Sequence, residues 1–241
     1  MANMNRVLLK LSGEQFEGSR DHGIDPEFVT KLARELKDVK DQTGTEITVV
    51  VGGGNFMRGA SIAAHGVERV TGDYMGMLAT VLNGMALVDI LEQQDQPARL
   101  QTRVRTDTVA EPYIRRKAMR HLEKGRLVVV AGGTGNPYVT TDTAAVTTAL
   151  ELNCDAVLKA TKVDGVYDKD PAKHKDASKY EHLSYQDVMT NTDIAVMDHA
   201  AISLARENEL PIVVFDLLTH GNIKRVVSGE SIGTEIGSRH G

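Results

Sequence analysis

The chain has little of what marks a secreted, disulfide-linked or nucleic-acid-binding protein. Its 241 residues include one cysteine, no tryptophan and four phenylalanines. Cys154 has no partner in the chain for a disulfide, which is typical of a reducing compartment, and we interpret it as a core packing residue. Lys and Arg number 28 against 33 Asp and Glu, a formal charge of -5, so the bulk charge does not indicate nucleic-acid binding.

Long apolar runs are also absent. The apolar stretch near the N-terminus is too short for a signal peptide, and we expect no segment long enough to span a bilayer. These observations predict a cytoplasmic protein without membrane partners. Strand-like runs alternate with helix-like ones, without a linker rich in proline or serine, so we expect a single α/β domain over residues 1–241.

Four apolar runs predict buried strands, and each ends in glycines or polar side chains. The runs are Arg6–Leu11, Ile47–Val51, Arg126–Ala131 and Asp155–Lys159. Two further strands are expected over Pro97–Gln101 and Ile212–Phe215. Open α/β sheets bind ligands at the carboxyl ends of their strands. The residues that follow these runs are therefore the candidates for chemistry, including Lys10 at the end of the first run.

The loop Gly132–Ala145 (GGTGNPYVTTDTAA) joins a predicted strand to a predicted helix. Its three glycines allow close backbone approach, and threonine hydroxyls and the free N–H groups of the helix suit an anion. An equally good interpretation is a glycine-rich turn in which Thr141 or Asp142 caps the helix.

A second glycine-rich loop, Gly52–Asn55, follows the strand Ile47–Val51. Three consecutive glycines favour a close approach to phosphate over a simple turn. Neither loop fits GxGxxG, and the chain contains no Gly-Lys pair, which excludes a Walker A loop. Any nucleotide phosphates must therefore be bound by another arrangement.

Three further segments are interpreted as structural and not as parts of the site of chemistry. Asp25-Pro26 predicts a helix that ends near Gly44, preceded by a mobile loop over Glu14–Gly23. The uncharged stretch Tyr74–Val88 is apolar all round, which predicts a helix buried on all sides, either central or, as we favour, packed against another subunit. The basic face of a predicted helix over Pro112–Lys124 is interpreted as solvated, with an anionic effector site as the alternative.

Five motifs in order resemble the amino-acid kinase superfamily and, within it, the bacterial uridylate (UMP) kinases. They are Lys10–Gly13 (KLSG), GGGN with Arg58, Gly72-Asp73, TGNPYVTTD, and KATKVDGVYDKDP, together with the MGMLATVLNG helix and the VMD that ends at Asp198. The resemblance covers nearly the whole chain. It implies a three-layer α/β/α sandwich on an open, mostly parallel sheet, and a homohexamer.

The resemblance also implies a reaction and its sites. The γ-phosphoryl group of ATP would pass reversibly to UMP with Mg²⁺, giving UDP and ADP in pyrimidine nucleotide biosynthesis. The acceptor part would cover about residues 1–150, and the ATP part about 151–241 plus the Lys10 loop. The implied ATP-binding residues are Lys10, Leu11, Ser12, Gly13, Gly54, Arg58, Thr161, Tyr167 and Asp170. The implied UMP-binding residues are Gly53, Asp73, Thr134, Gly135, Asn136, Pro137, Tyr138, Val139, Thr140 and Thr141.

Phosphoryl transfer requires mainly positioning and charge stabilisation, without a covalent nucleophile. Lys10 would supply one cation at the migrating group, and Lys159 or Lys162 a second, with Lys159 favoured. Asp142 would orient these lysines, which makes Lys10, Asp142 and Lys159 the predicted catalytic residues. We expect no protein cage for the metal, because Mg²⁺ keeps several waters and would be bound mainly through ATP.

Regulation and two other functions remain open. Many members of the family are activated by GTP and inhibited by UTP. Arg99 and Arg126 match positions that bind GTP, but Val88 and Glu92 stand where some relatives have a basic residue. The alternatives are a kinase that forms acyl phosphates on a carboxylate or carbamate, and a nucleotide- or oxyanion-binding protein without turnover. The presence of Lys10 and Asp142 disfavours the second.

Overall fold

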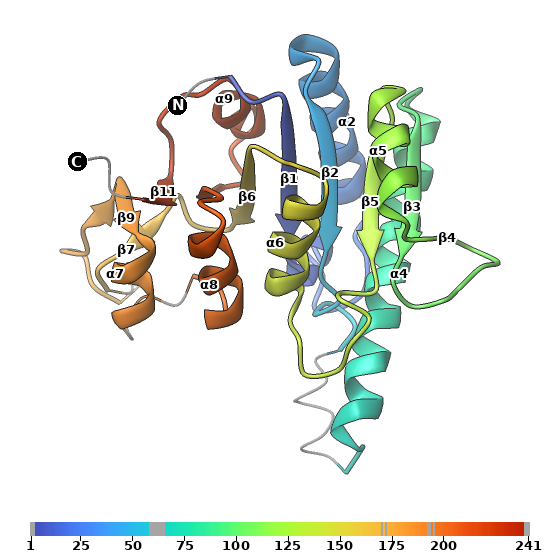
Figure 1. Ribbon diagram of the computed structural model, residues 1–241, viewed down its shortest axis with the longest axis horizontal. Helices are drawn as coiled ribbons and strands as arrows, with labels where there is room; N and C mark the ends of the chain where they lie inside the picture. The colour runs from blue at the N-terminus through green and yellow to red at the C-terminus, as the bar shows by residue number, and fades with distance from the viewer. Residues whose placement is uncertain are drawn as a thin grey trace.

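A central sheet with helices on both faces forms the core of the protein in the computed structural model, which describes residues 3–57, 66–169, 171, 173–191, 194 and 196–238 (Figure 1). The strands are β1 (Arg6–Leu11), β2 (Glu46–Val51), β3 (Ala98–Thr102), β4 (Glu111–Pro112), β5 (Leu127–Ala131), β6 (Ala156–Thr161), β7 (Val166–Tyr167), β8 (Lys179–Tyr180), β9 (His182–Ser184), β10 (Ile212–Asp216) and β11 (Thr234–Gly237). Within the described part, nine of them form one sheet in the order β4-β3-β5-β2-β1-β6-β10-β11-β9.

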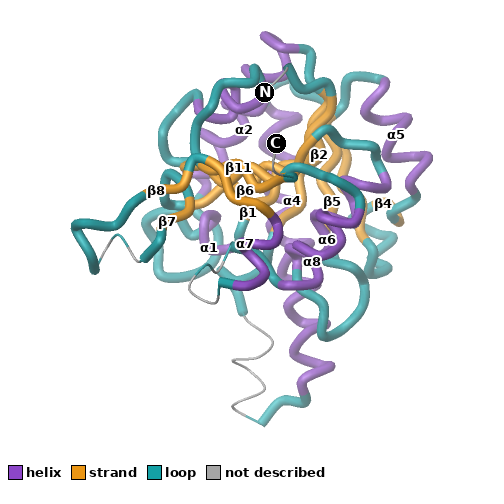
Figure 2. Tube along the Cα trace, turned by 60° about the vertical axis from the view of Figure 1, so that its left-hand side comes forward, coloured by secondary structure: helices purple, strands orange, loops and turns teal. Residues whose placement is uncertain are grey.

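The helices lie on both faces of this sheet (Figure 2). They are α1 (Gly13–Phe16), α2 (Pro26–Thr43), α4 (Arg69–Gln93), α5 (Arg115–Glu123), α6 (Thr141–Glu151), α7 (Tyr185–Thr190), α8 (His199–Glu207) and α9 (Asn222–Val227). Asp25 caps α2 by accepting a hydrogen bond from the Glu27 N–H, and Gly44 ends it in the left-handed conformation. The predicted α/β sandwich is confirmed.

Strand β1 is the centre of the parallel part of the sheet. It pairs in parallel with β2 on one side and β6 on the other. The chain proceeds from β1 to β2 in one direction and later returns to β6, so the strand order reverses beside β1, which is where open α/β sheets bind ligands. Lys10 and Lys159 are direct neighbours in the β1–β6 register.

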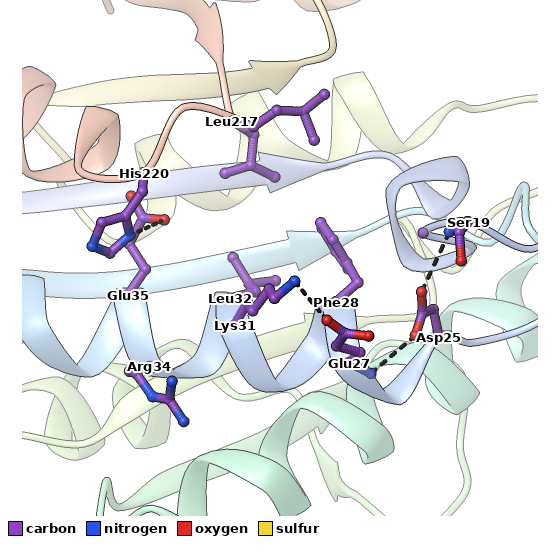
Figure 3. A pocket seen from close by; sticks show the side chains of 12 residues that line it. Ser19, Asp25, Glu27, Phe28, Lys31, Leu32, Arg34, Glu35, Leu217 and His220 are labelled. Carbon is purple, nitrogen blue, oxygen red and sulfur yellow. Dashed lines mark hydrogen bonds and ion pairs between the residues drawn. The ribbon is translucent and has the colours of Figure 1, made fainter.

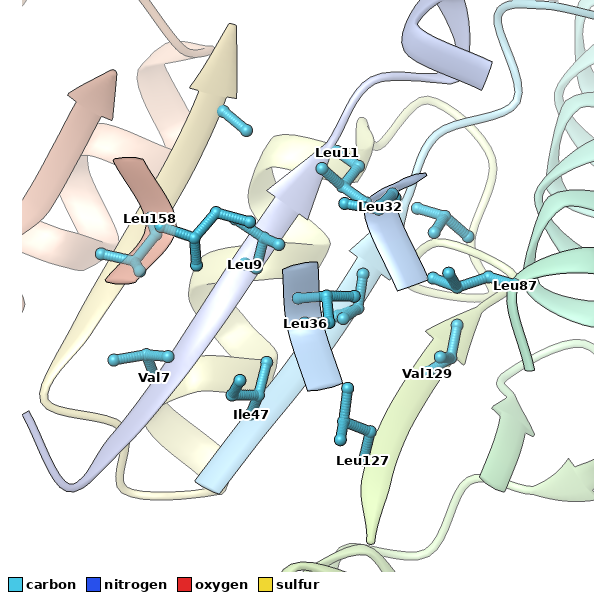
Figure 4. Packing of buried hydrophobic residues seen from close by; sticks show 14 of the residues in the cluster. Val7, Leu9, Leu11, Leu32, Leu36, Ile47, Leu87, Leu127, Val129 and Leu158 are labelled. Carbon is cyan, nitrogen blue, oxygen red and sulfur yellow. The ribbon is translucent and has the colours of Figure 1, made fainter. Parts of the chain in front are cut away.

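Two apolar cores follow from the alternation of side chains along each strand. On one face Val7, Leu9 and Leu11 of β1 pack with α2 and α4 (Figure 4). On the other face Leu8 belongs to the core that includes residues of α5, α6 and α8. Because Lys10 follows Leu8 by two positions, it points to the same face as Leu8, toward α6.

Some local predictions were wrong. Residues 14–16, the start of the loop expected over Glu14–Gly23, belong to the short helix Gly13–Phe16, which the hydrogen bond from the Ser12 N–H to the side chain of Gln15 stabilises. The helix expected over Pro112–Lys124 begins only at Arg115, since Glu111–Pro112 pairs with β3. The strands β4, β7, β8, β9 and β11 were not predicted, because segments of two to four residues are too short to show an alternating pattern.

Helix α4 differs most from expectation. It is long and apolar enough to cross a bilayer by length and composition alone, so our expectation of no such segment was wrong on length. Its contacts with α2, β3 and β5 place it against the sheet. Its first turns extend past the carboxyl ends of the strands (Figure 1).

Helix α4 is also not buried on all sides. Four large apolar side chains, spaced three or four residues apart on one face, are exposed: Tyr74 (42%), Leu78 (46%), Leu82 (48%) and Met85 (39%). The opposite face is buried and includes Thr80 and Asn83. The even distribution of apolar residues around this helix therefore reflects two different apolar faces, one of which is uncovered in the single chain.

Replacement of Leu36 tests the packing of α2 on the sheet. Leu36 is fully buried in the core shown in Figure 4. We expect Leu36→Ala to lower the free energy of unfolding by about 2–5 kcal/mol, since it removes apolar contacts and leaves a cavity. Leu218→Ala is the control, because Leu218 is 64% exposed and should change stability by less than about 0.5 kcal/mol. Equal urea midpoints for the two variants would contradict this packing.

Candidate active site

Two lysines and one aspartate meet at the carboxyl edge of the sheet. The Nζ of Lys10 lies 2.7 Å from Oδ1 of Asp142, and the Nζ of Lys159 lies 3.1 Å from Oδ2 of the same carboxylate. The three side chains are 9–16% exposed. The lysines come from neighbouring strands, and Asp142 comes from the first turn of α6. The structure thus brings together the three residues predicted to act in catalysis.

The charges in this cluster shift each other's protonation. Burial alone would raise the pKa of Asp142, but the ammonium groups of Lys10 and Lys159 outweigh it and hold the pKa below its ordinary value. Burial lowers the pKa of Lys159, although Asp142 opposes that shift. A buried carboxylate between two ammonium groups leaves a net positive charge, which suits an anionic ligand.

Asp198 supports the start of α6 from the neighbouring helix α8. Its carboxylate accepts hydrogen bonds from the hydroxyls of Thr140 and Thr143 and caps α8 through the Ala201 N–H. Thr140 is the N-cap of α6, accepting from the N–H of Asp142, so our assignment of Thr141 or Asp142 as cap was wrong by one or two residues. Apart from the VMD motif, we assigned no role to Asp198. Its contacts with α6 depend on tertiary packing.

The loops after β1 and β2 pack backbone against backbone. A Cβ added to Gly13 would lie 2.3 Å from the backbone N of Gly54, so a larger residue would force the loops apart. Both glycines belong to the predicted ATP site. Ser12 precedes Gly13 and is the N-cap residue of α1. The side chain of Leu11 is fully buried in the core, so any nucleotide contact of this residue would fall to its backbone.

A cavity of about 340 Å³ lies at the carboxyl ends of β6 and β10. Of the predicted ATP-binding and catalytic residues, Thr161, Tyr167 and Lys159 line it. The Tyr167 hydroxyl donates a hydrogen bond of 2.6 Å to Asp164, and this bond lowers the pKa of Asp164. Apolar Val163 and Val214 also line the cavity, so it combines apolar walls with a cation, as pockets for small ligands commonly do.

A second cavity, of about 410 Å³, lies between α4 and the loops after β2 and β5, whereas the first lies at β6 and β10. In the strand order, β1 with Lys10 stands between β2 and β6. The second cavity is lined by these predicted UMP-binding residues: Gly53, Asp73, Tyr138, Val139, Thr140 and Thr141. Gly54, which was predicted to bind ATP, lines this cavity and not the first one. Oδ2 of Asp73 accepts a hydrogen bond of 2.8 Å from the Tyr138 N–H, and Arg69 forms an ion pair of 2.9 Å with the same carboxylate. A carboxylate has about four acceptor positions, so Asp73 retains capacity for a ligand.

Other predicted residues lie elsewhere. The turn Thr134–Pro137 does not line the second cavity among the described residues, and the Thr134 hydroxyl contacts Asn136. Lys162 is exposed, in contrast to Lys159. Arg58 and Asp170 lie outside the described residues.

Other features of the described residues do not form a comparable site. A cavity of about 560 Å³ beside α2 contains a helix cap, Asp25, and a Glu35–His220 pair 3.7 Å apart (Figure 3). No group of three or more His, Cys, Asp or Glu side chains in the described part could hold a metal ion. Burial raises the pKa of the Cys154 thiol to about 12, which makes it unreactive.

Neutralising Asp142 tests the electrostatics of the cluster. We expect Asp142→Asn to lower the free energy of unfolding at neutral pH by about 3–5 kcal/mol, since two buried ammonium groups lose their counter-ion. The loss should shrink at high pH, because the pKa of Lys159 is already lowered and the neutral amine costs less to bury. Thermal unfolding at several pH values measures this.

The double variant Asp142→Asn/Lys159→Met is the control for that experiment. It removes one of the two cations, so it should be more stable than Asp142→Asn alone. A double variant no more stable than the single one would contradict the electrostatic account.

The wild type should lose stability as the pH falls through the depressed pKa of Asp142, which is the direction for a carboxylate stabilised in the folded state.

Comparison with known proteins identifies the family. The model of the amino acid kinase family matches residues 5–216. A UMP kinase structure from Bacillus anthracis is 39% identical with a TM-score of 0.93, covering 98% of this chain and 96% of that one. A UMP kinase from Ureaplasma parvum is 28% identical (TM-score 0.90; 99% and 100% covered), and a uridylate kinase from Archaeoglobus fulgidus is 30% identical (TM-score 0.75; 96% and 99% covered). The chain therefore belongs to the amino acid kinase family.

Proposed function

We propose that the protein is a UMP kinase, which transfers the γ-phosphoryl group of ATP to UMP and gives UDP and ADP. The observation that supports this most directly is the position of the Lys10–Asp142–Lys159 cluster between two cavities. Lys159 lines the cavity beside β6 and β10, and Thr141, next to Asp142, lines the other. The similarity to solved UMP kinases, over nearly the whole chain, supports the same assignment.

In this proposal the two lysines neutralise the migrating phosphoryl group. Their ammonium groups are fixed by one carboxylate before substrate binds, so little reorganisation is needed as charge develops in the transition state. Asp142 is the residue that orients them. The pairing of Lys159 with Asp142, and the exposure of Lys162, favour Lys159 as the second lysine.

The two cavities would hold the two nucleotides. ATP would occupy the one with Thr161 and Tyr167, with its phosphates toward the glycine loops after β1 and β2. UMP would occupy the other, with Asp73 accepting from the ribose hydroxyls. The lining residues of the acceptor cavity lie before residue 150 and those of the ATP cavity after it, which supports the proposed division of the chain.

Mg²⁺ would enter with ATP. Both carboxylate oxygens of Asp142 lie within 3.1 Å of ammonium groups, so this residue is not free to act as a metal ligand. The nucleotide oxygens would then supply most of the coordination, and the ion would screen the phosphate charges during transfer. The proposed setting is the cytoplasm, in pyrimidine nucleotide biosynthesis.

The decisive experiment offers Mg·ATP with UMP, CMP, carbamate or acetylglutamate in parallel. We expect UDP from UMP, and a decrease in kcat of about 10²-fold or more in Lys10→Ala, because a preorganised cation at the transferred group is lost. Lys37→Ala is the matched control, since Lys37 lies on α2 and pairs with Asp41. Chromatography of the nucleotides measures the products.

Other outcomes would favour the alternatives. Formation of an acyl phosphate from carbamate or acetylglutamate would show that the phosphoryl acceptor is a carboxylate or carbamate and not UMP. Binding of ATP without turnover of any acceptor would favour a binding protein and withdraw the catalytic roles. Full activity of Lys10→Ala would remove that residue from the chemistry while leaving the rest of the proposal.

Assembly into a homo-oligomer, as the family resemblance implies, is part of the proposal. The exposed apolar face of α4, formed by Tyr74, Leu78, Leu82 and Met85, is contiguous along the helix. Such a face is typical of a subunit interface, and a second copy of the same face would bury it symmetrically. A hexamer would need further contacts.

A charge on this face tests the assembly. We expect Leu82→Asp to shift the protein to a smaller species in light scattering coupled to size-exclusion chromatography, because an aspartate would have to be buried unpaired. Leu218→Asp, at a site that is 64% exposed, should leave the mass unchanged. An unchanged mass for Leu82→Asp would contradict this interface.

GTP activation and UTP inhibition remain expectations from the resemblance. Arg99 and Arg126 line a cavity of about 710 Å³ together with Lys124, Glu92 and Asp95, so three cationic side chains face two carboxylates there. Arg99 is held by Glu92 at 2.6 Å, so an anion would compete with that carboxylate. This pair is the physical reason to expect weaker GTP activation here than in relatives with a basic residue at position 92.

A further inference from the structure

We propose that Thr80 of α4 is a positioning residue for the acceptor site, acting through Gly132. This inference rests on the proposed function, since it concerns the cavity assigned to UMP. Thr80 is 2% exposed and lines that cavity. Sequence patterns did not single it out, because it lies in the uncharged stretch that reads as an apolar helix.

The hydroxyl of Thr80 has a fixed orientation. It donates a hydrogen bond of 2.6 Å to the carbonyl of Met77, one turn earlier on the helix. With its proton engaged, the oxygen accepts a hydrogen bond of 2.7 Å from the N–H of Gly132. Because both bonds are buried, neither is replaced by water at low cost.

Gly132 follows the last residue of β5 and begins the segment Gly132–Ala145, which contains most of the predicted UMP-binding residues. The pairing of β5 with β3 ends at Ala131 opposite Thr102, so the sheet supplies no partner for the next N–H. The Thr80 hydroxyl supplies that partner. Gly132 is in the left-handed conformation at φ 81°, and a Cβ there would lie 2.8 Å from the backbone N of Val104. The course of the chain at Gly132 is therefore set by its close approach to the backbone of Val104 and by its hydrogen bond to the Thr80 hydroxyl.

The same turn of α4 also leaves no room for a side chain at Gly53 in the loop Gly52–Asn55. A Cβ on Gly53 would lie 2.6 Å from the carbonyl of Gly76 and 3.1 Å from the N of Thr80. One turn later, Asn83 donates to the Gly52 carbonyl at 2.7 Å and exchanges hydrogen bonds with Asn55. Helix α4 thus contacts both walls of the acceptor cavity. It meets the wall that leads to Tyr138–Thr141 at two places, through Thr80 at Gly132 and through Asp73 at the Tyr138 N–H.

Steady-state kinetics of Thr80→Val and Thr80→Ser test this role. Valine preserves the shape and removes the hydroxyl, so we expect the KM for UMP to rise about tenfold, which corresponds to about 1.4 kcal/mol, while the KM for ATP changes less than about twofold. Serine retains the hydroxyl and should restore the UMP value. Hydrogen exchange at the Gly132 amide should be faster in Thr80→Val than in wild type.

Thr45→Val is the matched control. Thr45 is 3% exposed, and its hydroxyl donates 2.9 Å to the Met4 carbonyl before the start of β2, at the opposite edge of the sheet. The Thr45→Val variant should unfold at a lower temperature than the wild type, without a change in the KM for UMP or for ATP. If Thr80→Val changes neither the UMP KM nor exchange at Gly132, or if Thr45→Val raises the UMP KM equally, the inference is wrong and the proposed function stands. Absence of UDP formation by the wild type would overturn both.

Discussion

The arrangement of the site depends on one electrostatic constraint, the sharing of a single carboxylate by two ammonium groups. Lys10 and Lys159 are neighbours in the register of adjacent parallel strands, so their side chains emerge on the same face and would repel each other. Asp142, at the start of α6, lies within 3.1 Å of both. Each element is held by its own packing: β1 and β6 in the centre of the sheet, and α6 against α8 and β1. The rigidity of the sheet is therefore what keeps like charges together without substrate.

The consequence is a binding edge that is prepared before any anion arrives. The net positive charge lies between two cavities, and the glycine loops of β1 and β2 are packed too closely to accept side chains. A transferred phosphoryl group would replace water beside preoriented cations, which is the main contribution a protein can make to such a reaction. Asp198 fixes the first turn of α6, which carries Asp142, by accepting hydrogen bonds from Thr140 and Thr143.

Helix α4 links this edge to the outside of the molecule. Its buried face contacts Gly132 after β5 through Thr80 and Gly52 after β2 through Asn83. Its opposite face exposes Leu78 and Leu82. A partner docked on the exposed face would pack on the same turns that hold the acceptor cavity. Assembly and acceptor binding would then share one rigid element, which is a physical route for coupling between subunits.

The sequence by itself determined the principal strands, the fold class and the candidate residues at the strand ends, because apolar runs and glycine punctuation are local signals. Lys10, Asp142 and Lys159 were also identified from sequence, but their convergence was a hypothesis until the β1–β6 register and the position of α6 were known. Thr80 and Asp198 had no local signal, since a threonine in an apolar helix and a helix-capping aspartate are common. The exposed face of α4 was likewise invisible in an even apolar pattern. Tertiary structure decided these points because they depend on which groups meet across the sheet, and contacts between segments distant in sequence leave no periodicity in the chain.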